Sequence, residues 1–365
     1  MKALFIGGTG TISSAITRLA VQEKWDIYHL NRGTRKGDFK GVTQIKCDIR
    51  TEKPEDIRKK LEKSLGTVKP AAEGGFVSKL LFKITGKKKP AETKPSVNKF
   101  DVVVDFIAFV PDHVQKDFEI FNGLCRQFIF ISSASAYQKP PSNYLITEST
   151  PLANPYWQYS RDKIICEEVL MERYRETGFP ITIVRTSHTY DERSVPLGVH
   201  GKNGSWQVLK RMIDGKPVII HGDGTSLWTL THNSDFANAF IRLMGNIHAI
   251  GEAVHITSDE SLTWNQIYQI IADALGVELK AVHISSESLD KQSQGQYDFE
   301  GSLIGDKANS VVFDNTKIKR LAPEFCAKVR ADEGIKLTIA NVLKDKKLQQ
   351  EDPEFDAWCD NIITN

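Results

Sequence analysis

Three observations predict an α/β fold with a doubly wound parallel sheet and a smaller C-terminal α/β lobe. Continuously apolar runs alternate with stretches of helical periodicity in the first half of the chain, which is typical of parallel strands covered by helices on both faces. A glycine-rich turn separates the first apolar run from the first periodic stretch. The 365 residues also exceed the roughly 250–300 residues at which a single core stops growing, so two lobes are expected.

The first lobe is predicted to span residues 1–185. It opens with a βαβ unit made of a strand from Lys2 to Ile6, a helix from Thr11 to Lys24 and a strand from Ile27 to Leu30. Further elements are predicted as strands at Thr43 to Cys47, Asp101 to Ile107, Gln127 to Ser132 and Ile181 to Val184, and as a helix at Tyr159 to Thr177. The sheet is expected to be complete with the last of these strands.

The second lobe is predicted to span residues 186–365, with part of residues 215–245 packing back on the first lobe. Glycine-rich connections separate its short elements, so the pattern is looser than in the first lobe. The predicted elements are helices at Trp206 to Asp214 and Trp264 to Leu275, strands at Val218 to His221 and Ala253 to Thr257, and a charged helical tail from Gly334 onward.

Residues 58–99 interrupt the pattern where a doubly wound fold needs one crossover helix. They hold twelve Lys or Arg against three Asp or Glu, a net charge of +9, whereas the rest of the chain carries −7. Within them, residues 76–84 are predicted as a short basic amphipathic helix. We interpret the segment as a solvated insertion, while contact with a partner or a membrane surface, or a role as an active-site flap, stays open.

Composition predicts an ordinary globular protein. Apolar residues make up 40% and charged residues 26% of the chain, and the net charge of +2 gives little reason to expect nucleic acid. No apolar run approaches the ~18 residues that a transmembrane span needs, and the first residues lack a signal-peptide pattern, so a cytoplasmic location is expected. The five cysteines are widely spaced and odd in number, so we expect reduced packing cysteines, no disulfide framework and no metal site.

The glycine turn after the first strand predicts a dinucleotide site. Pyrophosphate must approach the backbone N–H groups at a helix N-terminus, and a side chain there would block it. Gly7 and Gly10 meet this requirement, and Ser13 stands where the usual third glycine would be. A Rossmann-type unit that binds NAD(P) is therefore expected. The residues predicted to contact the cofactor are Gly7, Gly8, Thr9, Gly10, Thr11, Ile12, Asn31, Arg32, Asp48, Ile107, Ala108, Tyr159 and Lys163.

The end of the second strand favours NADP over NAD. An NAD-selective site places a carboxylate there for the ribose 2′-hydroxyl, whereas this chain has Asn31 followed by Arg32. A guanidinium suits a 2′-phosphate, and a carboxylate would repel it. A basic surface loop is the alternative interpretation of Arg32. Asp48, which ends the third strand, is expected to meet the adenine edge.

Ser133, Tyr159 and Lys163 are the candidate catalytic residues. A Tyr and a Lys four residues apart share one helix face, so the ammonium is expected to lower the pKa of the phenol and to reach the nicotinamide ribose. A Ser hydroxyl at a strand end can hold the substrate oxygen beside the Tyr during hydride transfer. Such a Tyr–Lys pair also occurs on solvated helix surfaces, and that alternative stays open.

Several ordered motifs resemble the short-chain dehydrogenase/reductase superfamily, in particular its extended and atypical branch of NAD-dependent epimerase/dehydratase proteins. The likeness extends over most of residues 1–280. It rests on GGTGTIS at 7–13, SSASAY at 132–137, YSRDK at 159–163 and GKPVIIHGDGTSLWTLTHNSDFANAF at 215–240. The resemblance implies that Ser133 holds the substrate oxygen, that Tyr159 is the acid/base and that Lys163 is its partner. It also implies a second lobe that holds the substrate, and a helix-paired homodimer is common among such proteins.

Two positions depart from the pattern of sugar-nucleotide 4-epimerases. His188 stands where these enzymes commonly carry an Asn, and Trp228 replaces an Arg that contacts the pyrophosphate. The missing guanidinium weakens the case for a nucleotide diphosphate sugar. Both residues are candidate substrate contacts, although His188 can also be a hydrogen-bonded loop histidine. His232 and Asp235 are expected to fix the join between the lobes.

The preferred function is NAD(P)-dependent oxidoreduction or epimerisation at a hydroxyl or carbonyl carbon of a small, polar, sugar-like substrate. The alternative is a non-catalytic NAD(P)-binding module that binds RNA or another anionic partner, because the atypical branch includes proteins resembling chloroplast stem-loop RNA-binding proteins and the insertion is basic. The intact set of Ser133, Tyr159 and Lys163 favours chemistry, since a binding module does not need it.

Overall fold

A seven-stranded parallel sheet organises the N-terminal half of the molecule, and the predicted fold class is confirmed. The computed structural model describes residues 1–33, 39–66 and 98–364. The strands of this sheet are β1 (Lys2–Ile6), β2 (Asp26–Asn31), β3 (Val42–Lys46), β4 (Val102–Asp105), β5 (Phe128–Ser133), β7 (Ile181–Thr186) and β12 (Ala253–Ile256). Their order is β3-β2-β1-β4-β5-β7-β12, and all neighbours run parallel. The order changes direction between β1 and β4, the point at which open α/β sheets bind ligands.

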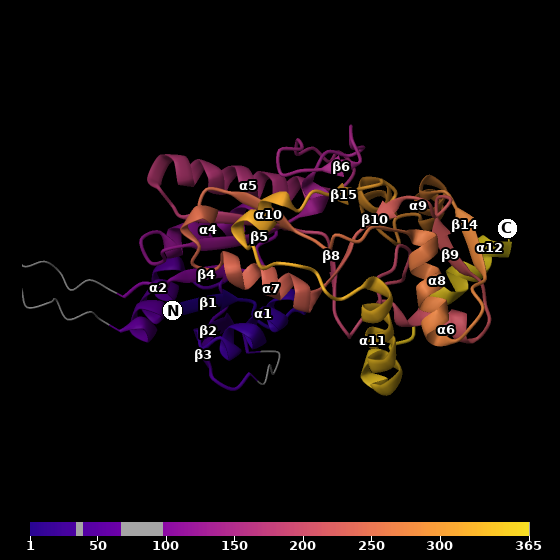
Figure 1. Ribbon diagram of the computed structural model, residues 1–365, viewed down its shortest axis with the longest axis horizontal. Coiled ribbons are helices and arrows are strands. Elements are labelled where there is room, and N and C mark those ends of the chain that lie inside the picture. The colour runs from indigo at the N-terminus through magenta and orange to yellow at the C-terminus, as the bar shows by residue number, and fades with distance from the viewer. Residues whose placement is uncertain (34–38, 67–97, 365) are drawn as a thin grey trace, which may run out of the picture.

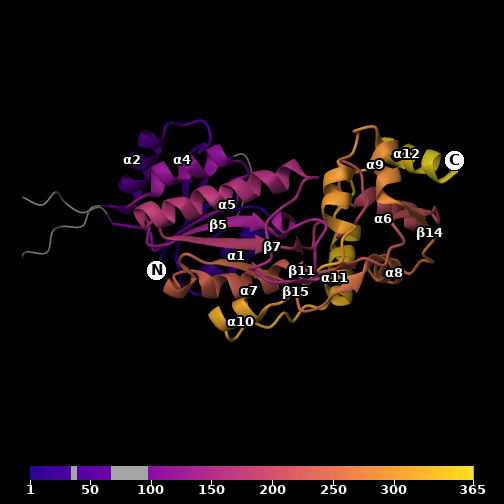
Figure 2. The same ribbon diagram turned by 90° about the horizontal axis from the view of Figure 1, so that it is seen from above.

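Helices cover both faces of this sheet, as Figures 1 and 2 show. One layer consists of α1 (Thr11–Gln22), α7 (Asn233–Leu243) and α10 (Thr316–Leu321), and the other of α2 (Pro54–Leu65), α4 (Pro111–Phe121) and α5 (Gln158–Thr177). Successive residues of β1 alternate between the two cores, because Phe5 packs against the first layer and Leu4 and Ile6 against the second. Burial on both faces explains why this strand is apolar throughout.

The sequence pattern predicts that the sheet ends with β7. This prediction is wrong, because β12 pairs with the outer edge of β7. His255 interrupts the apolar run of the strand predicted at Ala253 to Thr257, so its pattern does not show that it is the edge strand of the main sheet. The side chain of His255 is nevertheless fully buried, with Nδ1 3.0 Å from the Tyr137 hydroxyl and Nε2 2.8 Å from the Asp314 carbonyl. A polar residue with both ring nitrogens hydrogen-bonded can occupy a buried strand position, so this strand could not be placed by apolar periodicity alone.

The predicted insertion at 58–99 starts too early, because α2 occupies residues 54–65. This helix is the crossover between β3 and β4, and it buries Ile57, Leu61 and Leu65 in the core. Its lysines lie on the exposed face, which made the segment resemble a basic insertion. The remaining part, including the basic helix predicted at 76–84, lies outside the described residues.

A second packed unit lies at the far end of the molecule in Figures 1 and 2. Its core surrounds Trp264, Ile267 and Leu209, which are fully buried. Its elements are β9 (Val218–His221), β14 (Ala281–Ile284), α6 (Trp206–Ile213), α8 (Trp264–Leu275), α9 (Ser286–Ser293), α11 (Ala331–Lys344), α12 (Pro353–Thr364) and the π-helix Glu300–Lys307. The strands β9 and β14 pair in parallel.

Three short ladders lie between the main sheet and this unit. They pair β8 (His188–Tyr190) with β11 (Leu230–His232), β10 (Leu227–Trp228) with β13 (Leu262–Thr263), and β6 (Leu145–Ile146) with β15 (Val312–Phe313). Asp235, at the start of α7, accepts hydrogen bonds from the backbone N–H groups of Lys328 and Val329 at 2.9 and 2.8 Å. These bonds tie α7 to the segment that leads into α11.

Four of the five cysteines are buried and pack in the core, but the expectation fails for Cys326, which is exposed. None of the helices in the described part of the chain is both long and apolar enough to cross a membrane.

Candidate active site

The glycine turn between β1 and α1 lies at the carboxyl edge of the sheet and leaves no room for a side chain at Gly7 or Gly8. Gly7 has a φ of +81°, and a Cβ on it would lie 2.4 Å from Cγ2 of Ile107. A Cβ on Gly8 would lie 2.5 Å from Nε2 of the buried His29. The turn therefore brings bare backbone N–H groups to the start of α1, where an anion is favoured.

Ser13 takes the place of the usual third glycine and closes this turn. Its hydroxyl donates to the Gly7 carbonyl at 2.9 Å and accepts from the Gly10 N–H at 2.8 Å. The side chain is buried. The turn is thus held in shape by the chain's own hydrogen bonds, which reduces the ordering cost of binding a ligand.

A cleft of about 510 Å³ extends from the turn past the ends of β2 and β3. The predicted cofactor residues in its lining are Gly7, Thr9, Gly10, Asn31, Arg32, Asp48 and Ile107. The side-chain carbonyl of Asn31 accepts from the Gly33 N–H at 3.0 Å, and its amide donates to Gln44. Arg32 is exposed in the lining and no carboxylate ends β2. The size and lining of this cleft fit a dinucleotide.

The other predicted residues of the glycine turn lie behind this lining or beside it. Gly8 packs on His29, and Ile12 packs against the core beneath α1. The Thr11 hydroxyl accepts from Nη2 of Arg193 at 3.0 Å, and Asp191 binds the same guanidinium. Arg193 was not predicted, and it brings a positive charge from the C-terminal half of the chain next to the turn, where it complements an anionic pyrophosphate.

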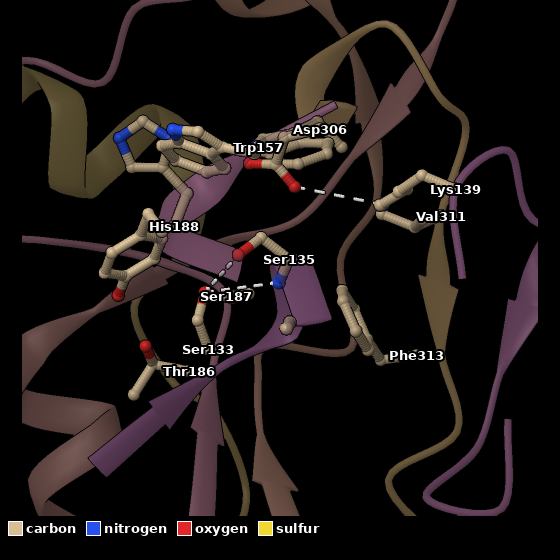
Figure 3. Close-up of a pocket in the computed structure, with 13 residues that line it drawn as sticks. Ser133, Ser135, Lys139, Trp157, Thr186, Ser187, His188, Asp306, Val311 and Phe313 are labelled. Atoms are coloured by element: carbon tan, nitrogen blue, oxygen red, sulfur yellow. Dashed lines mark hydrogen bonds and ion pairs between the residues drawn. The ribbon is translucent and has the colours of Figure 1, made fainter. Parts of the chain in front are cut away.

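A chain of hydroxyl groups orients Ser133, which ends β5. The Ser160 hydroxyl donates to Oγ of Ser135 at 2.7 Å, and the Ser135 hydroxyl lies 2.8 Å from Oγ of Ser133. The backbone N–H of Ser135 also donates to Oγ of Ser133 at 3.2 Å, which Figure 3 shows. Either hydroxyl can be the donor between Ser133 and Ser135, and when Ser135 donates, the Ser133 proton is available to the pocket.

Tyr159 lies in the first turn of α5 and lines the same pocket as Ser133. Burial raises the pKa of Tyr159; a hydrogen bond with Ser133 lowers it and the charge of Asp306 raises it, and the net shift is upward. The expectation that Lys163 lowers this pKa is therefore wrong. The ammonium lies 5.7 Å from the centre of the Tyr159 ring and donates its hydrogen bonds elsewhere. Tyr159 is a protonated phenol at neutral pH, which suits a proton donor.

Lys163 is buried on α5, four residues after Tyr159. Its ammonium donates to the carbonyls of Ala108 and Ile131, both at 2.7 Å. Ala108 is itself buried, and its chain neighbours Ile107 and Phe109 line the cleft. Burial lowers the pKa of Lys163 to about 8, so its charge is retained at neutral pH and lost in mild alkali.

The substrate pocket has a volume of about 270 Å³ and is drawn in Figure 3. Its lining includes Ser133, Ser135, Lys139, Trp157, Tyr159, His188, Trp228 and Asp306. Burial lowers the pKa of His188 to about 3, so this predicted substrate residue is neutral and can donate or accept one hydrogen bond. The buried indole N–H of Trp228 has no hydrogen-bond partner within the described residues.

Sequence reasoning missed nine of the thirteen residues that line this pocket, among them Ser135, Lys139, Trp157 and Asp306. Ser135 lies within the quoted serine motif, and its i+2 spacing from Ser133 was a readable signal. Trp157, Lys139 and Asp306 carry no such signal, because they reach the pocket from separate loops and from the π-helix.

Comparison with known proteins confirms the resemblance to the epimerase family. Residues 108–257 match a family model described as the NAD dependent epimerase/dehydratase family. A 2'-dehydrokanamycin reductase from Streptomyces kanamyceticus is 27% identical over 198 residues, which cover 54% of this chain and 54% of that protein. The chain spans about half the length of the curated relatives that it matches first.

Two further similarities concern the alternative function and the fold. The chloroplast stem-loop binding protein of 41 kDa b from Arabidopsis thaliana is 25% identical over 79% of this chain and 67% of that protein. A structure of UDP-glucuronic acid 4-epimerase from Bacillus cereus, in complex with UDP-glucuronic acid and NAD, matches with a TM-score of 0.67. It is 17% identical and covers 94% of this chain and 99% of that chain, which establishes the shared fold.

Proposed function

We propose that this protein is an NAD(P)-dependent oxidoreductase that acts at a hydroxyl or carbonyl carbon of a small, sugar-like substrate, in the direction of reduction. One observation carries the proposal: Ser133 and Tyr159 line one pocket, and Lys163 bonds to the carbonyl of Ala108, whose chain neighbours line the cleft beside the glycine turn. The phenol of Tyr159 is protonated at neutral pH, since its pKa lies above the ordinary value, so it is in the state that can donate a proton to a carbonyl oxygen during reduction. The related reductase and epimerase families support the same chemistry.

Each residue has a defined task in this reaction. The bound nicotinamide would supply hydride to the carbonyl carbon. Ser133 donates a hydrogen bond to the substrate oxygen, and Tyr159 transfers its proton to that oxygen as negative charge develops there. The Lys163 ammonium donates to the Ala108 and Ile131 carbonyls and has a third N–H with which to reach the nicotinamide ribose. Neutral His188 and the two indole rings of the pocket hold the substrate.

We further infer that NADP(H) is preferred. Arg32 in the cleft lining supplies a cation for a 2′-phosphate, and Asn31 removes the carboxylate that would repel it. Glycine-turn N–H groups and Arg193 would hold the pyrophosphate.

Isotope transfer tests the proposed reaction. The protein is incubated with NADPH carrying deuterium at nicotinamide C4 and with a set of keto-sugars, and the products are analysed for deuterium at the former carbonyl carbon. The proposal predicts stereospecific transfer by the wild-type chain and none by Ser133→Ala/Tyr159→Phe. Absence of transfer from either face of the nicotinamide to any keto-sugar contradicts it.

A binding module for RNA is the second candidate, supported by the similarity to the stem-loop binding protein. It predicts salt-sensitive binding of a stem-loop RNA that disappears when residues 67–97 are replaced by a Gly/Ser linker. Tight RNA binding together with no isotope transfer would favour this function over catalysis.

A further inference from the structure

A buried ion pair forms part of the wall of the substrate pocket and has no task in the chemistry above. Nζ of Lys139 lies 3.8 Å from Oδ1 of Asp306, and the two side chains are 2% and 12% exposed. Lys139 follows the serine motif at the end of β5, and Asp306 belongs to the π-helix Glu300–Lys307. Figure 3 shows the pair across the pocket from Thr186, with both side chains directed at each other.

The two groups have hydrogen-bonding capacity to spare. Within the described residues, neither the Lys139 ammonium nor the Asp306 carboxylate has a partner nearer than this ion pair. The 3.8 Å separation exceeds the ~2.7–2.9 Å of a direct charge-assisted hydrogen bond. An ammonium offers three donors and a carboxylate only acceptors, so two neighbouring hydroxyl groups can bind here, one accepting and the other donating.

The surroundings of the pair favour a ligand without a net charge. Lys139 and Asp306 balance each other, and the nearby Lys307 ammonium is bound to the Ser302 carbonyl at 3.1 Å. Burial lowers the pKa of both lysines and raises the pKa of Asp306, so the pocket penalises an unpaired charge. A substrate carboxylate or ammonium would disturb this balance. The rings of Trp157 and Trp228 in the same lining offer apolar faces for the C–H faces of a ring.

The pair also lies close to the reacting end of the pocket. The charge of Asp306 contributes to the raised pKa of Tyr159, so the carboxylate is within electrostatic reach of the phenol. A substrate held by the pair therefore extends to Tyr159 across the pocket.

We propose that Lys139 and Asp306 are the specificity-determining pair of this pocket and select a neutral, polyhydroxylated ring. One ring hydroxyl accepts from the Lys139 ammonium, and a neighbouring hydroxyl donates to the Asp306 carboxylate. The inference rests on the proposed function, because it takes this pocket as the substrate site.

Removing one charge at a time tests this pair. Saturation-transfer NMR, with NADP⁺ bound to the full chain, is recorded for three pools of ligands: methyl glycosides of glucose, galactose and mannose, the corresponding uronic acids, and the corresponding 2-amino sugars. The wild type is expected to prefer the neutral pool. Asp306→Asn leaves the Lys139 charge and is expected to favour the uronic acids about tenfold, whereas Lys139→Met leaves the carboxylate and is expected to favour the amino sugars to a similar degree.

Two further proteins keep the outcome decisive. Lys139→Met/Asp306→Asn has neither charge, so it stays testable where a single variant folds poorly, and it is expected to lose the discrimination by charge. The control, Asp56→Asn/Lys59→Met, removes an ion pair on α2 whose side chains are 58% and 75% exposed. It is expected to keep the wild-type ranking.

The same ranking in the wild type, the single variants and the double variant would overturn the proposal, and so would the absence of saturation transfer from every pool. These outcomes differ from failure of the proposed function, which appears as missing deuterium transfer from NADPH and does not depend on ligand charge.

Discussion

The cofactor cleft and the substrate pocket are built in opposite ways. The cleft is lined by residues between Gly7 and His113, from one stretch of alternating strands and helices, and its glycine turn presents backbone N–H groups. The pocket draws residues from five separate stretches between Ser133 and Phe313, and its walls carry a buried ion pair and aromatic rings. The contrast teaches that local backbone geometry places the cofactor, whereas tertiary packing selects the substrate.

Lys163 bonds to the carbonyl of Ala108 beside the cleft and follows Tyr159 of the pocket on α5, so its loss should affect both regions. Lys163→Met is expected to weaken NADPH binding and to lower kcat by about 10²-fold in the same protein, because the nicotinamide ribose loses the ammonium that would hold it in place for hydride transfer. Steady-state rates and calorimetric titration measure the two effects. Glu168→Gln, on the exposed face of the same helix, is the control and should change neither. A lower kcat with unchanged cofactor affinity would contradict this role.

Substitutions at two glycines of the turn should distinguish an effect on stability from an effect on cofactor binding. Gly8→Ala is expected to destabilise the fold by about 1–3 kcal/mol, because its Cβ would lie 2.5 Å from the His29 ring. Gly10→Ala meets only Oγ of Ser13 at 3.5 Å, so its melting temperature should hardly change while NADPH binding is lost. Thermal unfolding and calorimetry distinguish the two variants. Equal melting temperatures would show that His29 moves aside.

The cofactor preference depends on one exposed side chain. Arg32→Ala is expected to weaken NADP(H) binding about tenfold and to leave NAD(H) binding unchanged, because only the 2′-phosphate loses a partner. Calorimetry with both cofactors measures this, and NAD(H) is the internal control. Equal losses for the two cofactors would show that Arg32 acts on the fold of the loop rather than on the phosphate.

The pH dependence of kcat/KM should report the loss of the Lys163 proton. The pKa of Lys163 is about 8 because burial disfavours its charge, whereas the pKa of Tyr159 is above its ordinary value. In the direction of reduction, kcat/KM should therefore be level near neutral pH and fall above about pH 8, as Lys163 loses its proton. Lys163→Arg retains its charge and should move this fall to higher pH. A rate that rises from pH 7 to 9 would instead indicate a phenolate base.

The cofactor half of the molecule was predictable because its signals are local. A strand, a glycine turn and a helix are contiguous in sequence, and the turn's requirement for small residues can be read at Gly7 and Gly10. The features that could not be predicted there depend on packing. The His29 ring leaves no room for a side chain at Gly8, and Arg193 reaches Thr11 from the other half of the chain.

The substrate half was predictable only at its motif. Ser133 and Tyr159 were found because β5 and the start of α5 carry recognisable patterns, but Lys139 and Asp306 meet only after the chain folds. The direction of the Tyr159 pKa was also mistaken, since sequence spacing shows that Lys163 shares its helix face but not that two backbone carbonyls bind the ammonium. Burial, which the spacing does not show, decides that pKa.

The most direct test of the central claim is to remove only the phenol oxygen of Tyr159. With a keto-sugar found by isotope transfer, kcat is measured for the wild type and for Tyr159→Phe, beside the NADPH dissociation constant of each. The account predicts a loss of about 10²–10⁴-fold in kcat with unchanged cofactor affinity, because proton transfer disappears while the ring and the glycine turn at Gly7 remain. Turnover close to that of the wild type would contradict it and would make Tyr159 a packing residue.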